Sequence, residues 1–162
     1  MEKKRILVID DEVTFTRMLR LNLEKTGHYE VREENRGRRG TSAAREYKPH
    51  LIFLDVIMPD VDGGEVASLI KGDPNLKDVP IVFLTATVSK REVGVGGMMR
   101  GGLFFLAKPV TLQQLLDCIE KHLGKPEPIA APAAEAKVEA KPEVPVPVIP
   151  AVPGNTQPGA SA

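Results

Sequence analysis

Four short apolar runs, each leading into a polar or charged residue, constrain the fold of this chain more than any other feature. They occupy residues 6–9, followed by Asp10 and Asp11; residues 51–54, followed by Asp55; residues 81–84, followed by Thr85; and residues 103–106, which lead to Lys108. Apolar runs without polar alternation are typical of strands that are covered on both faces. A weaker, edge-like strand is expected at residues 29–31.

Helical patterns alternate with these runs. Apolar residues recur at helical spacing in residues 13–25, 64–71 and 111–123, and a capping-box pattern at 89–92 predicts the start of a fourth helix. We expect that helix to include three of the glycines in the segment 94–102, and therefore to stay frayed or mobile until phosphorylation or a partner orders it. Five strands alternating with five helices predict an α/β protein. The expected fold is a flavodoxin-like (βα)5 three-layer sandwich with a five-stranded parallel sheet in the order 2-1-3-4-5.

The prolines divide the chain. Nine of the 14 lie in residues 125–162, a segment that is also rich in alanine and contains no aromatic residue. Proline removes a backbone donor and fixes φ, so this segment is expected to be an extended tail or linker without a core. The predicted domain is residues 1–124, with a Pro/Ala-rich tail at 125–162.

Composition excludes several classes of protein. The 22 basic and 22 acidic side chains cancel, which argues against a nucleic-acid-binding module. The single cysteine, Cys118, allows no internal disulfide. No apolar run approaches the roughly 20 residues that span a bilayer, and the N-terminal apolar run is too short for a signal peptide. We expect a cytoplasmic protein that binds neither nucleic acid nor membrane directly.

The polar residues that end the strands predict a chemical site. In a parallel α/β sheet the carboxyl ends of the strands share one edge, so these residues are expected to meet there: Asp10, Asp11, Asp55, Thr85 and Lys108. Three clustered carboxylates repel one another unless a cation neutralises them, and an all-oxygen site suits Mg²⁺. Taken singly, these residues also fit a helix cap, a strand end and a solvated lysine. Their coincidence at four strand ends favours the site.

The sequence motifs also resemble those of a known family. Residues 6–12 (ILVIDDE), 54–63 (LDVIMPDVDG), 84–86 (LTA) and the pair Lys108-Pro109 together resemble the receiver domain of bacterial two-component response regulators, chemotaxis regulators among them. The resemblance covers residues 3–123, in the right order and spacing. It implies that Asp55 accepts a phosphoryl group from the phosphohistidine of a sensor kinase or from a phosphotransfer protein. The metal ligands would be Asp10, Asp11, Asp55 and the backbone carbonyl of Ile57, with Mg²⁺ as cofactor and Mn²⁺ as a substitute.

The resemblance also implies a conformational switch. Thr85 and Lys108 would bind the phosphoryl group, Thr85 and Phe105 would carry the switch, and Pro109 would follow a cis peptide bond. Phe105 stands where tyrosine is commoner, and core packing alone also accounts for it. The output would pass to a protein partner at the face formed by the fourth helix, fifth strand and fifth helix. Such a receiver is a monomer or a phosphorylation-dependent dimer, and it is no separate enzyme, although it catalyses its own phosphorylation and dephosphorylation.

Two other functions are weighed against the switch. A phosphatase with an aspartate nucleophile requires a second aspartate two residues later, where this chain has Ile57. A scaffold that is never phosphorylated would act through its Pro-rich tail. The complete set of site residues argues against that scaffold.

Overall fold

The computed structural model describes residues 2–86, 97–100 and 103–128. Residues 1–127 form one unit and residues 128–162 a second, of which only Pro128 is described. The elements of the first unit are β1 (Lys4–Ile9), α1 (Val13–Lys25), β2 (Tyr29–Glu34), the 3₁₀ turn η1 (Gly37–Arg39), α2 (Gly40–Tyr47), β3 (Leu51–Asp55), α3 (Gly63–Lys71), β4 (Ile81–Thr85), β5 (Met98–Arg100), β6 (Leu103–Ala107) and α5 (Leu112–Leu123).

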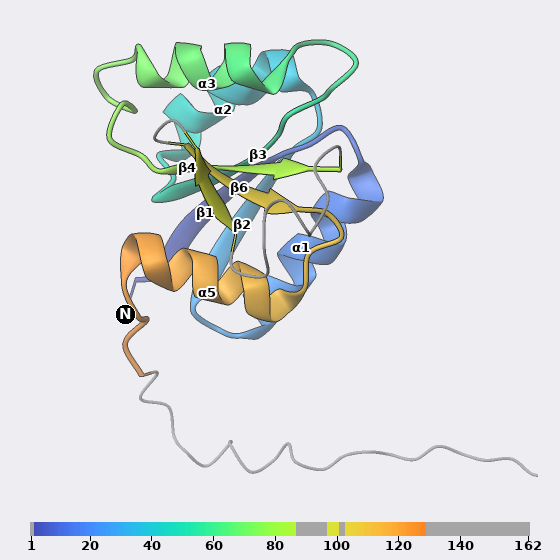
Figure 1. Ribbon diagram of the computed structural model, residues 1–162. Helices are drawn as coiled ribbons and strands as arrows, with labels where there is room; N and C mark the ends of the chain where they lie inside the picture. Colours follow the sequence, from blue (N-terminus) through green and yellow to red (C-terminus); the bar gives the residue numbers. More distant parts are fainter. Residues whose placement is uncertain (1, 87–96, 101–102, 129–162) are drawn as a thin grey trace, which may run out of the picture. The chain divides into compact units, whose positions relative to one another are not determined.

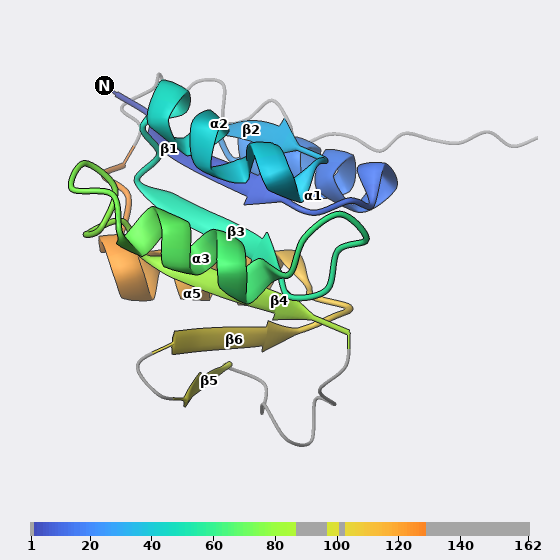
Figure 2. The same cartoon turned by 90° about the horizontal axis from the view of Figure 1, so that it is seen from above.

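The strands form one sheet in the order β2-β1-β3-β4-β6-β5. β2, β1, β3, β4 and β6 are parallel to one another, so the predicted parallel order 2-1-3-4-5 is confirmed, with β6 as its fifth strand. β2 lies at one edge, as its weaker apolar pattern predicted, and is three residues longer than expected. Figure 2 shows the strands side by side, with the short β5 beyond β6 at the other edge.

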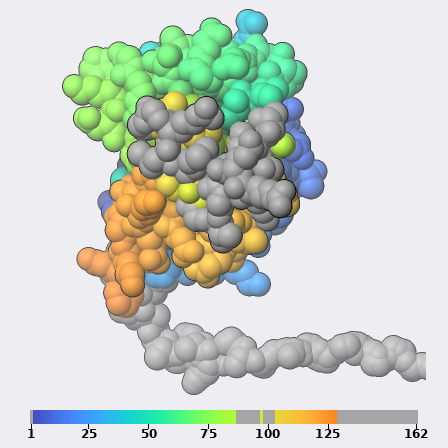
Figure 3. All heavy atoms as spheres, viewed as in Figure 1, coloured from blue at the N-terminus to red at the C-terminus, as the bar shows by residue number. Residues whose placement is uncertain are grey.

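Helices cover both faces of the sheet. Figure 1 shows α1 and α5 on one side and α2 and α3 on the other, and in Figure 3 the green atoms of α3 and the orange atoms of α5 lie far apart on the surface. Alternate residues of β1 enter two cores: Ile6 and Val8 pack with α1 and α5, whereas Leu7 and Ile9 pack with α2 and α3. Burial on both faces explains why the strands are continuous apolar runs.

Local capping explains where two of the helices start. The Thr111 side chain accepts a hydrogen bond from the Gln114 N–H, and the Gln114 side chain bonds back to the Thr111 backbone, which completes a capping box on α5. Asp62 caps α3 by accepting from the Gly64 N–H at 2.7 Å. Both caps satisfy backbone donors that have no partner within the helix.

The segment predicted as the later part of a fourth helix contains a strand instead. Residues 89–96, where that helix would begin, lie outside the described residues. Met98–Arg100, however, is β5, paired antiparallel with β6 through Met98↔Phe105 and Arg100↔Leu103, so a helix through these residues was wrong. The backbone of Gly97 has φ +87°, which no α-helix contains. The pair Gly101-Gly102, directly before the apolar run 103–106, is a sequence signal for a turn that the helical interpretation overlooked.

Candidate functional site

The carboxyl ends of the parallel strands bring three acidic residues together. Asp10 and Asp11 follow β1, and Asp55 is the last residue of β3. One oxygen from each carboxylate lies within 4.8 Å of the other two. Asp10 is fully buried and Asp55 nearly so, whereas Asp11 is exposed to solvent. The cluster therefore opens to solvent on the side of Asp11.

Lys108 reaches into this cluster from the end of β6. Its Nζ lies 2.6 Å from Asp10 Oδ2 and 3.8 Å from Asp55 Oδ1, although 98 residues separate Asp10 and Lys108 in the sequence. The ammonium also lies 4.4 Å from the centroid of the Phe15 ring. Burial lowers the pKa of Lys108, but the hydrogen bond and the charge of Asp10, with those of Asp55 and Glu12, outweigh it and raise the pKa above 10.5. The lysine is therefore a permanently charged group at the site.

Asp55 is an acidic residue whose ionised form is disfavoured in the folded protein. Burial is the main reason that its pKa rises from 3.8 to about 6, and the nearby Asp10 charge adds to the increase. Lys108 and a hydrogen bond from the Ile57 backbone oppose that increase only in part. A further cation beside Asp55 would compensate the remaining negative charge. The donor set consists of carboxylate oxygens, which are the ligands that Mg²⁺ prefers, so the residues present fit this metal.

The loops that carry these residues are held by backbone hydrogen bonds. Asp10 donates its N–H to the Glu34 carbonyl at 3.1 Å, and its Oδ1 accepts the Glu12 N–H at 2.9 Å. On the loop between β3 and α3, Ile57 pairs with Asp62 in an isolated bridge, and its side chain is exposed.

The remaining predicted site residues lie on β4 and β6. Thr85 is buried at the end of β4, and its carbonyl accepts the Lys108 N–H at 2.8 Å. Phe105 is partly buried, and its ring stacks on Phe83 with centroids 5.1 Å apart. The peptide bond between Lys108 and Pro109 is cis. Phe105 thus packs against the α2–α3 side of the core, and Thr85 and Lys108 share the site edge.

Sequence reasoning missed two residues that contact the site. Phe15 lies under Lys108, but in the sequence it reads only as one apolar residue of α1. The Asn35 side-chain amide donates to the Asp10 carbonyl at 2.8 Å. The predicted end of β2 at residue 31 was three residues early. A strand ending at Glu34 would have placed Asn35 at the carboxyl edge of the sheet, among the site residues.

Comparisons with known proteins agree with this geometry. Residues 6–120 match the model of the response regulator receiver domain family. The chain is 33% identical over 120 residues to protein PilH of Pseudomonas aeruginosa, covering 74% of this chain and 98% of PilH. It is 30% identical over 134 residues to the DNA-binding dual master transcriptional regulator RpaA of Synechocystis sp., covering 83% of this chain but only 55% of RpaA.

A solved structure also matches. The receiver domain of a sensor histidine kinase from Pseudomonas aeruginosa, which has a magnesium ion coordinated in its active-site cleft, superposes with a TM-score of 0.63. The two are 25% identical, and the match covers 76% of this chain and all of that domain. The fold, the site and these matches define a receiver domain. The chain belongs to the response regulator receiver domain family.

Within residues 2–86, 97–100 and 103–128, no helix has both the length and the apolar content that crossing a bilayer requires.

Proposed function

We propose that this chain is a phosphorylation-dependent signalling switch in which Asp55 accepts a phosphoryl group in a Mg²⁺-dependent reaction. One observation carries the proposal: the carboxylates of Asp10, Asp11 and Asp55 lie within 4.8 Å of one another. Lys108, 3.8 Å from Asp55, supplies the positive charge that such a cluster needs for phosphoryl transfer. The phosphoryl donor is the phosphohistidine of a sensor kinase or of a phosphotransfer protein.

In the reaction, an oxygen of ionised Asp55 attacks the phosphorus atom. A P–O bond forms to Asp55 while the P–N bond to the donor histidine breaks, and the histidine leaves with the bonding electron pair. Mg²⁺, when held by Asp10, Asp11, Asp55 and the Ile57 carbonyl, supplies charge neutralisation on the phosphoryl oxygens. Lys108 pairs with one of those oxygens.

The switch then acts on Thr85 and Phe105. Thr85 donates its hydroxyl to the phosphoryl group, and Phe105, which packs on Phe83, moves into the space that Thr85 leaves. The output reaches a protein partner at the face that includes β6, the fifth parallel strand, and α5, together with the predicted fourth helix; residues 89–96, where that helix is predicted to begin, lie outside the described residues. We further propose a cytoplasmic receiver that is a monomer or a phosphorylation-dependent dimer and that catalyses its own dephosphorylation.

Mass spectrometry tests this function directly. The protein is incubated with a small acyl phosphate and Mg²⁺, and the modified peptide is mapped. We expect the mass of one phosphoryl group on the peptide that contains Asp55, none after addition of EDTA and none in Asp55→Asn. Lys108→Ala should be modified far more slowly.

The same experiment tests the alternative of a scaffold that acts through its Pro-rich tail. An unmodified wild-type protein in the presence of Mg²⁺ would favour that scaffold over the switch. The matched control is Asp73→Asn, since Asp73 is an equally buried carboxylate that pairs with Arg45 at 2.6 Å and is not part of the cluster. This variant should be modified like the wild type.

A further inference from the structure

The loop between β2 and α2 contacts both of the loops that carry the candidate metal ligands. We propose that Asn35 and Asp60 are positioning residues that set the Mg²⁺ affinity of the site by joining those two loops through residues 35–38. This inference rests on the proposed function, because it concerns the same metal site. Neither residue is itself a ligand in the proposal.

Asn35 connects residues 35–38 to the loop that follows β1 through side-chain hydrogen bonds. We call this connection, and the matching one made by Asp60, a joint. The Asn35 Nδ2 donates to the Asp10 carbonyl at 2.8 Å and to Thr16 Oγ1 at 3.0 Å. Thr16 is fully buried in the first turns of α1, and its Oγ1 also lies 2.7 Å from a carboxylate oxygen of Glu33. One amide group therefore ties the backbone of Asp10 to the start of the helix that follows it.

Asp60 forms the joint to the loop that follows β3. Its carboxylate accepts the Gly37 N–H at 3.2 Å and the Arg38 N–H at 3.0 Å. The Arg38 guanidinium donates to the Asp60 carbonyl at 2.9 Å. The backbone hydrogen bond from Arg38 is the main reason that the pKa of Asp60 lies below its usual value. Asp60 is three residues from Ile57 and thus holds the part of the loop that carries the carbonyl ligand.

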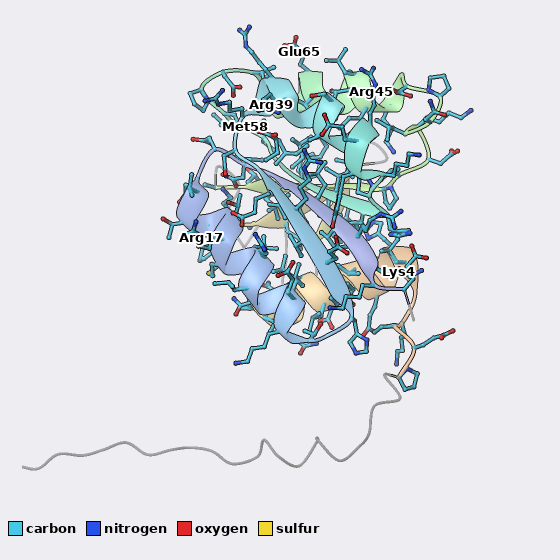
Figure 4. All side chains as sticks on the ribbon, turned by 180° about the vertical axis from the view of Figure 1, so that it is seen from behind. Lys4, Arg17, Arg39, Arg45, Met58 and Glu65 are labelled. Atoms are coloured by element: carbon cyan, nitrogen blue, oxygen red, sulfur yellow. The ribbon has the colours of Figure 1, made fainter. Side chains whose placement is uncertain are left out.

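The joined loops pack closely at Gly37. A Cβ atom on Gly37 would lie only 2.4 Å from Val61 Cγ1 and 2.8 Å from Met58 Cε, so a side chain at this position would force its neighbours to shift. Figure 4 shows Arg39 and Met58, one from each loop, at the same end of the molecule. β1 and β3 fix where the two ligand loops leave the sheet, because these strands are paired directly. The contacts of Asn35 and Asp60 fix the course of the loops beyond that point.

The two joints follow one another along the path that connects the ligand loops. The effects of the two substitutions on Mg²⁺ affinity are therefore expected not to multiply. Breaking either joint disconnects the loops, so breaking the second costs little more. We expect Asn35→Ala and Asp60→Ala each to weaken Mg²⁺ binding on the order of tenfold, as is typical for groups that orient metal ligands. The double variant should bind about as weakly as the weaker single variant. Independent roles would instead multiply the two effects.

The test is a Mg²⁺ titration of the full chain followed by amide chemical shifts, with urea unfolding in EDTA as a separate measure of stability. Asp60→Asn keeps one of the two side-chain acceptors, without the charge, and should lose less affinity than Asp60→Ala. Ser42→Ala removes a hydrogen bond of similar length, to the Arg39 carbonyl in the same region, and should leave the affinity unchanged.

The outcomes separate this inference from the proposed function. A wild-type protein that binds no Mg²⁺ overturns the metal site itself and the inference with it. A wild-type protein that binds Mg²⁺, with variants of lower stability in EDTA but the same affinity, overturns only the positioning role. Multiplied effects in the double variant overturn the series connection, and an Asp60→Asn variant as weak as Asp60→Ala shows that charge rather than position matters.

Discussion

At Asp55, the protonation state that stabilises the fold differs from the one that the proposed reaction needs. Its pKa of about 6, raised mainly by burial, means that the folded protein resists the ionised form that the reaction needs. Between pH 3.8 and 6 the folded state therefore holds a proton that the unfolded chain has lost. The stability contributed by neutral Asp55 is fully present below pH 3.8 and is lost as the pH rises through 6.

Replacement of Asp55 by a neutral isostere should remove this conflict. We expect Asp55→Asn, in EDTA at pH 7.5, to be more stable than the wild type by up to roughly 3 kcal/mol, the equivalent of the raised pKa. At pH 4.5 the difference should be much smaller. Urea unfolding at the two pH values measures it. Excess Mg²⁺ should stabilise the wild type more than the variant, and an equal response of both proteins would contradict the metal assignment of Asp55.

His50 should show the opposite pH dependence, far from the site. The ring Nδ1 of His50 accepts the backbone N–H of Arg5 at 2.9 Å. The backbone N–H of His50 donates to the backbone carbonyl of Arg5. Burial, followed by the charges of Arg5 and Lys4, lowers the pKa of His50 below 6.5, so the folded state favours the neutral ring. The stability that neutral His50 contributes is present above pH 6.5 and is lost as the pH falls.

Two substitutions of His50 separate the hydrogen bond from the titration. His50→Asn places an oxygen near the position of Nδ1, so it should keep the bond and abolish this part of the pH dependence. His50→Ala should lose about 1 kcal/mol at pH 7.5 because the Arg5 N–H loses its acceptor. Urea unfolding between pH 5 and 7.5 tests both variants. An unchanged pH dependence in His50→Asn would assign the effect to another group.

At the scale of elements, the sequence predicts what burial controls. The continuous apolar runs of β1, β3, β4 and β6 place four strand ends, and with them Asp10, Asp55, Thr85 and Lys108, because both faces of those strands are covered. Contacts at the edges of the sheet were harder to predict. The last residues of β2, Arg32, Glu33 and Glu34, are all charged, so its end and Asn35 were missed, and β5 forms through backbone pairing that leaves no mark on an apolar pattern.

Gly97, the residue directly before β5, provides an element-scale prediction. An alanine at Gly97 would hold φ at +87° and place its Cβ 2.5 Å from the Phe104 ring. Gly124 has a similar φ of +82°, but a Cβ there would meet nothing within 4 Å. Both Gly97→Ala and Gly124→Ala should lose roughly 1–3 kcal/mol of stability because each imposes a positive φ on a residue with a side chain. Only Gly97→Ala should add a packing penalty of about 1–3 kcal/mol, since Phe104 is a buried core residue.

Urea unfolding of the two glycine variants makes the comparison. A larger loss for Gly97→Ala, with faster amide exchange along β6, is the expected result. Equal losses would mean that Phe104 moves aside at little cost and that the β5–β6 pairing does not depend on Gly97.

At the scale of the whole molecule, function is expected to reside in the first unit. α5 ends at Leu123, the family match ends at residue 120, and every candidate site residue precedes residue 110. A chain truncated after Glu127, where the first unit ends, should therefore keep its urea midpoint, its Mg²⁺ affinity and its phosphorylation by an acyl phosphate. All three are measured beside the full chain at one ionic strength.

A loss of stability would show that residues 128–162 belong to the fold, and unchanged stability with slower phosphorylation would show that the Pro-rich segment acts on the site. Equal values would leave the segment as a tether or a partner-binding element, which partner binding by the full and truncated phosphorylated chains would then distinguish.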